Sequence, residues 1–144
     1  MARVPVAVVD GKARYNGRAL ADWVPAALER IVAAFAPVRV ILFGSVARGD
    51  DGPDSDIDLL VVLHEIPGRR HDAAVAVLRA LRDLPPPVDV LVTDPRRIAE
   101  TGDLPGVLRV ALREGRVVHD RAARDARRSR RAVVAVGAGG SPPR

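Results

Sequence analysis

The chain has 144 residues, of which 48% are hydrophobic and only 3% aromatic, and it contains no cysteine. This length suits one domain with an aliphatic core, and the lack of cysteine excludes a disulfide scaffold and a zinc–thiolate site. The formal charge of +5 comes from residues 121–144, which carry seven arginines and one aspartate, because residues 1–120 are nearly neutral. The charge therefore argues against a nucleic-acid-binding core, and only the tail supports an RNA-binding alternative.

The N-terminal residues contain one short apolar run that Pro5 interrupts, which is unlike a signal peptide, and no later apolar run is long enough to span a membrane. We therefore expect a cytoplasmic protein without membrane contact. Turn signals at Asp10–Gly11 and Asn16–Gly17 predict a short hairpin over residues 3–18.

An amphipathic pattern follows the hairpin, with apolar side chains three or four positions apart over residues 22–35. It predicts a helix that Asp22 caps and that has Pro25 in its first turn, where proline is tolerated. We expect Trp23 and Tyr15 to pack this helix against the hairpin.

The rest of the chain alternates short β-branched runs with amphipathic runs. Strands are predicted at residues 38–43, 56–63, 88–93 and 116–119. Helices are predicted at residues 71–84, before the prolines Pro85–Pro87, and 104–114, before Gly115, with a turn or short helix opening at Asp94.

This order of elements predicts an α/β (α+β) domain with a small mixed β-sheet flanked by helices. We place the domain at residues 21–120. Residues 1–20 form a hairpin-like extension, and residues 121–144 form a basic tail that we expect to be disordered.

Carboxylates gather at the start of one predicted strand. Asp56 and Asp58 are two residues apart, so in a strand they project from the same face, opposite Ile57 and Leu59. Two such close carboxylates repel each other unless one keeps its proton or a cation joins them. Mg²⁺, a hard cation that takes oxygen ligands, suits this pair.

Asp89 is a single carboxylate within another apolar strand, VDVLVT. If that strand pairs beside residues 56–63, three carboxylates converge. Three carboxylates from two strands could hold two magnesium ions about 3.5–4 Å apart, as in phosphoryl-type displacement.

A glycine–serine turn precedes these carboxylates in the segment FGSVARG. Backbone N–H groups of a short helix opening at Ser45, together with its hydroxyl, favour phosphate oxygens, and Gly44 allows a close approach. Arg48 is a further phosphate ligand or, alternatively, a surface partner of the neighbouring aspartates. We expect solvated side chains for these aspartates, Asp50, Asp51 and Asp54, because GDDGPD is ordinary turn composition.

The stretch GSVARGDDGPDSDIDLLV resembles the signature of the DNA polymerase β-like nucleotidyltransferases, and the short chain is similar to their minimal nucleotidyltransferase (MNT) group over about residues 22–120. The resemblance implies that Gly44 and Ser45 bind the triphosphate and that Ser55 shapes the turn that presents the carboxylates. It further implies that Asp56 and Asp58 hold both metal ions and that Asp89 completes one metal site and acts as the base.

The resemblance also implies a partner and a reaction. Proteins of the MNT group commonly transfer AMP from ATP to a tyrosine of a HEPN-domain toxin, and so act as its antitoxin. Larger relatives carry a further domain for the acceptor, so we expect another protein to supply it here. A non-catalytic antitoxin-like binding module and nucleotidyl transfer to a small-molecule hydroxyl remain the alternatives.

Overall fold

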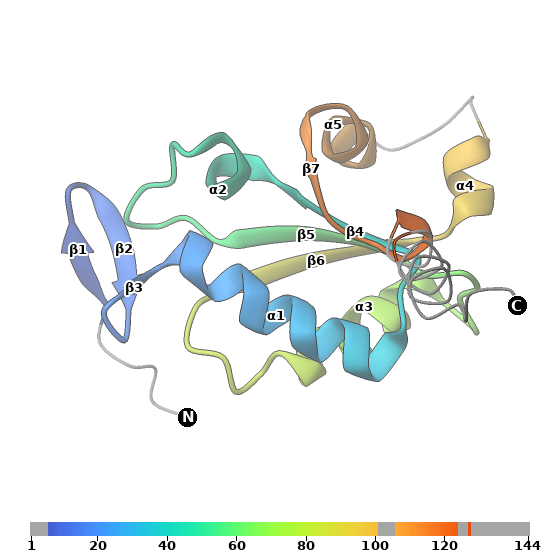
Figure 1. Cartoon of the computed structure of the whole chain (residues 1–144), viewed down its shortest axis with the longest axis horizontal. Coiled ribbons are helices and arrows are strands. Elements are labelled where there is room, and N and C mark those ends of the chain that lie inside the picture. The colour runs from blue at the N-terminus through green and yellow to red at the C-terminus, as the bar shows by residue number, and fades with distance from the viewer. Residues whose placement is uncertain (1–5, 101–105, 124–126, 128–144) are drawn as a thin grey trace, which may run out of the picture.

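A four-stranded mixed sheet forms the centre of the molecule in the computed structural model, which describes residues 6–100, 106–123 and 127. Its strand order is β6-β5-β4-β7. Strand β4 (Arg39–Phe43) runs antiparallel to β5 (Ile57–Val62) and to β7 (Arg116–Asp120), whereas β5 is parallel to β6 (Val88–Thr93). Helices cover both faces of the sheet (Figure 1), which confirms the predicted fold class.

Apolar side chains bury both faces of the sheet. On one face lie α1 (Leu20–Phe35) and α3 (Arg70–Ala80), and the other carries α5 (Gly106–Glu114) beside α4 (Pro95–Ala99). Side chains of β5 alternate between these layers, because a strand turns successive residues to opposite faces. Ile57, Leu59 and Val61 pack in the α1–α3 core, and Leu60 and Val62 pack beside α5.

The N-terminal segment forms a separate three-stranded antiparallel sheet, β1-β2-β3. Its strands are β1 (Ala7–Val9), β2 (Lys12–Tyr15) and β3 (Arg18–Ala19). The residues of both predicted turns have positive φ, as two-residue hairpin turns require. The Trp23 indole donates a hydrogen bond to the Tyr15 carbonyl over 3.1 Å, so the hairpin packs on the start of α1 as predicted.

Helix α1 begins earlier than the sequence pattern predicted. Its N-cap is Ala19, so Asp22 lies in the first turn of the helix and does not cap it. The carboxylate there still faces the positive end of the helix dipole. Pro25 lies inside the helix, and because proline lacks an N–H, the Ala21 carbonyl loses its helical donor. The start shifts because β3 leads directly into the helix.

Helix α3 ends at Ala80, so the prediction that it continues to Leu84 was wrong. Tight turns follow instead, in which Leu81 donates to the Leu78 carbonyl and Leu84 to the Leu81 carbonyl. Pro85 disfavours a helical conformation at Leu84, which explains why the helix does not include that residue.

Several sequence predictions fall near the undescribed residues. Helix α5 matches the predicted helix from residue 106, and residues 104–105 lie outside the described residues. The predicted tail also lies outside them, apart from residues 121–123 and 127. Within the described part of the chain, none of the helices has the length and apolar character needed to cross a membrane.

Candidate active site

The predicted phosphate-binding turn and the predicted carboxylate pair meet at one end of the sheet. Helix α2 (Gly44–Arg48) follows β4 directly, and Phe43 at the end of β4 pairs with Asp58 of β5. Gly44 has a φ of +74°, and a Cβ there would overlap the Asp58 carboxylate oxygen. Glycine is therefore needed both for the left-handed backbone and for the approach of this carboxylate.

The third carboxylate lies on the neighbouring strand. Asp58 and Asp89 are register partners across the parallel pair β5 and β6, as the prediction required. Both project from the α5 face, because their chain neighbours Leu59 and Val90 pack in the opposite core. Asp56, just before β5, and Asp89 are exposed, whereas Asp58 is partly buried.

This arrangement raises the pKa of the Asp58 carboxyl from 3.8 to about 6. Desolvation by burial is the largest cause, followed by the negative charges of Asp89 and Asp56, whereas Arg48 lowers this pKa. A cation bound beside these carboxylates would favour the ionised form of Asp58 and relieve the repulsion.

The chemistry of the donor set fits a hard divalent cation, because all three predicted ligands are carboxylates. The repulsion on Asp58 is also what a cation would offset. Within residues 6–100, 106–123 and 127, however, no group of three or more acidic, His or Cys side chains is close enough to hold a metal ion. Asp58 and Asp89 share one end and one face of the sheet, and Asp56 directly precedes β5. The two-magnesium site stays a prediction.

The other predicted nucleotide ligands surround α2. Arg48 is exposed and its Nε lies 3.2 Å from Asp50 Oδ2, which is the surface pairing that the sequence left as the alternative. Ser45 is partly buried at the start of α2. The Ser55 hydroxyl accepts a hydrogen bond from the Gly52 N–H at 2.8 Å, so it shapes the turn before Asp56 as predicted.

Asp51 corrects one prediction. Asp50 and Asp54 are exposed as expected, but Asp51 is buried, with 7% of its surface accessible. The Lys12 ammonium lies 3.3 Å from Asp51 Oδ1 and also donates to the Gly49 carbonyl at 2.8 Å. No sequence signal marked Lys12, because its contact joins residues far apart in the chain.

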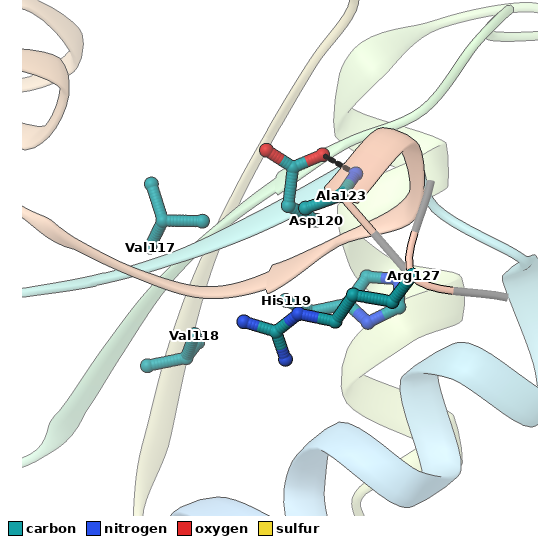
Figure 2. Close-up of a pocket in the computed structure, with 6 residues that line it drawn as sticks. All are labelled: Val117, Val118, His119, Asp120, Ala123 and Arg127. Atoms are coloured by element: carbon teal, nitrogen blue, oxygen red, sulfur yellow. Dashed lines mark hydrogen bonds between the residues drawn. The ribbon is translucent and has the colours of Figure 1, made fainter. Parts of the chain in front are cut away.

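A hollow lies at the other end of the sheet. It is lined by Val117, Val118, His119, Asp120, Ala123 and Arg127 (Figure 2). Asp120 pairs with Arg39 at the start of β4, whereas Asp58 pairs at the end of β4, so the hollow is remote from the carboxylates. None of the predicted site residues, all of which lie in the described part of the chain, lines it.

The nucleotidyltransferase domain family is the class that this fold and site indicate, and its family model matches residues 24–118. The chain belongs to this family. This family agrees with the resemblance that the sequence motif indicated.

Particular relatives add detail to this assignment. A Methanocaldococcus jannaschii protein, provisionally named a protein adenylyltransferase, is 59% identical over 29 residues, and this match spans 20% of the chain and 29% of that relative. A Sulfolobus solfataricus structure, provisionally named a nucleotidyltransferase, is 27% identical with a TM-score of 0.53, covering 72% of this chain and 82% of that one. A toxin–antitoxin structure with AMP-PNP is 20% identical with a TM-score of 0.44, covering 78% of this chain and 86% of that one.

Proposed function

We propose that this protein transfers AMP from ATP to a hydroxyl group of a partner protein, and that the partner is a HEPN-domain toxin that the transfer inactivates. The observation that carries the chemistry is the approach of Asp58 to Gly44, which brings the turn and the carboxylates together. The short match to a named adenylyltransferase supports AMP as the transferred group. The toxin partner rests on the resemblance of the motif to the MNT group.

The start of α2 would bind the triphosphate. The first backbone N–H groups of a helix have no partner within the helix, so those of α2 can donate to phosphate oxygens together with the Ser45 hydroxyl. Arg48 would add a charge-assisted hydrogen bond by leaving its exposed partner Asp50. Replacing Asp50 by a phosphate oxygen costs little free energy, because an exposed ion pair contributes about 0–1 kcal/mol.

In the proposed reaction, the acceptor oxygen bonds to the α-phosphorus of ATP. The bond from that phosphorus to the bridging oxygen breaks, and pyrophosphate leaves with the electron pair. Asp89 accepts the proton of the acceptor hydroxyl, and its exposure leaves it accessible to another protein. Asp56, Asp58 and Asp89 would hold Mg²⁺, which when bound supplies neutralisation of the phosphate charge.

Transfer of label from α-labelled ATP, with Mg²⁺ present, tests this function in cells that co-express the toxin partner. We expect label on the partner with the natural chain and about 10³-fold less with Asp56→Asn or Asp58→Asn. Asp54→Asn is the matched control, since it removes one exposed carboxylate from the same segment.

Two outcomes would contradict the proposal. Label that persists in both carboxylate variants would show that Asp56 and Asp58 are not needed for the transfer. Neutralisation of the toxin without ATP, Mg²⁺ or label would instead favour a binding module that acts by occlusion.

A further inference from the structure

We propose that the N-terminal hairpin is part of the active site, with Lys12 as a positioning residue that holds the loop between α2 and β5. This inference rests on the proposed function, because it concerns the same site. The Lys12 ammonium contacts two groups of that loop, the Gly49 carbonyl at 2.8 Å and the Asp51 carboxylate at 3.3 Å. Figure 1 shows the loop extending from α2 toward β2 before it enters β5.

The loop joins the two halves of the site. At its start, Gly49 ends α2, and the Asp50 N–H donates to the Ser45 carbonyl at 3.1 Å. At its end, Ser55 accepts from the Gly52 N–H, and Asp56 follows directly. The position of this loop therefore sets the spacing between the phosphate-binding turn and the first carboxylate.

Burial separates the Lys12 contact from an ordinary surface ion pair. Only 6% of the Asp51 side chain is exposed, so its charge depends on a partner within the protein. Among the described residues, Lys12 is the cation that reaches it. By contrast, 66% of the Asp83 side chain in the pair Arg30–Asp83 is exposed, so solvent screens that pair and it contributes little.

The hairpin itself is anchored on its apolar face. Ala13 and Tyr15 of β2 are buried in the core, and Trp23 of α1 donates to the Tyr15 carbonyl. Residues of a strand alternate between faces, so Lys12 and Arg14 project from the other side. The hairpin thus presents Lys12 to the loop from a fixed support, although residues 1–20 have no part in the sequence motif.

Two measurements on the full chain test this role. The first is hydrogen exchange of the backbone amides of residues 50–55, apart from Pro53, which has no N–H; this measurement needs no nucleotide. The second is the dissociation constant for α,β-methylene-ATP with Mg²⁺, an analogue whose α–β linkage resists transfer. The variants are Lys12→Met, Lys12→Arg and Asp51→Asn, and Arg14→Met is the matched control. Arg14 carries the same charge on the same face of β2, but its hydrogen bond goes to the Gly17 carbonyl and not to the loop.

We expect Lys12→Met and Asp51→Asn to speed exchange in residues 50–55 and to weaken binding of the analogue by about tenfold, the lower end for outer-shell residues. Lys12→Arg should keep most of the slow exchange and most of the affinity for the analogue, and Arg14→Met should change neither quantity. The double variant Lys12→Met/Asp51→Asn should behave as either single variant does, because both act through one contact.

Unchanged exchange in Lys12→Met, or an equal change in Arg14→Met, would overturn the inference. If Lys12→Met fails to fold, Asp51→Asn and Lys12→Arg still give the comparison. Failure of the natural chain to bind the analogue would contradict the proposed function alone, since the exchange measurement would still decide whether Lys12 holds the loop.

Discussion

The segment from α2 to β5 contains two carboxylates in opposite surroundings, Asp51 and Asp58. Asp51 is buried, and the Lys12 ammonium compensates its charge. Asp58 is partly buried beside Asp89 and Asp56, and this raises its pKa to about 6. The chain stabilises the first carboxylate by itself and leaves the second in need of a cation. Such an uncompensated group is typical of a functional site, whereas a compensated one is typical of a structural contact.

Substitution of Gly44 should have the largest effect on the Asp58 side of this comparison. Gly44→Ala places a methyl group on the Asp58 carboxylate and forces a non-glycine residue to keep positive φ. We expect the free energy of unfolding to fall by about 2–4 kcal/mol, from backbone strain and overpacking together. Urea unfolding of the two proteins measures this loss.

Gly49→Ala is the matched control for that loss. Gly49 also has positive φ, at +81°, but nothing lies within 4 Å of a Cβ there. The Gly49→Ala variant should therefore lose only the free energy that comes from backbone strain, about 1–2 kcal/mol. Equal losses of unfolding free energy in the two variants would show that the contact between Asp58 and residue 44 does not affect stability.

Substitution of Lys12 should have a smaller effect on the Asp51 side. Lys12→Met leaves the buried Asp51 carboxylate without its cation, and we expect a loss of about 1–2 kcal/mol, since the exposed part of Lys12 is screened by solvent. Arg30→Met breaks a shorter ion pair, 2.7 Å, whose carboxylate is exposed, and should cost less than about 1 kcal/mol. Urea unfolding at low and high salt compares the two variants. Equal losses of unfolding free energy would show that the Lys12 ion pair contributes no more than an ordinary surface pair.

The same contrast explains which features the sequence could predict. Strands β5 and β6 follow from β-branched runs, and the side on which Asp58 lies follows from alternation. The meeting of Asp58 with Asp89 was conditional, because single-strand patterns do not specify which strands pair. It is the parallel register of β5 and β6 that brings the two together.

The Lys12–Asp51 contact was beyond the reach of sequence reasoning for a related cause. Asp51 was predicted to be solvated from turn composition, a local criterion. Its burial depends on the placement of a hairpin that lies more than thirty residues earlier in the chain. The start of helix α1 was missed for a local reason instead, because β3 leads directly into Leu20.

Substitution of Asp58 and of Asp51 by asparagine should change the free energy of unfolding by small amounts of opposite sign. In metal-free buffer at pH 7, Asp58→Asn should raise the free energy of unfolding, because it removes a charge that the folded state disfavours. The raised pKa of about 6 corresponds to about 3 kcal/mol at 1.36 kcal/mol per unit, and solvent screening of this partly buried group reduces the expected gain to about 1 kcal/mol.

The pH dependence of that gain follows from the raised pKa. Between pH 4 and 6 the folded state binds the Asp58 proton more tightly than the unfolded state, so the stability of the natural chain falls as pH rises through this range. The gain from Asp58→Asn should therefore be complete above about pH 6 and absent below about pH 4. Asp51→Asn should instead lower stability at pH 7, because Lys12 loses its anionic partner. Urea unfolding of the three proteins across this pH range decides the point, and a loss of stability in both variants at pH 7 would mean that Asp58, like Asp51, is compensated within the chain.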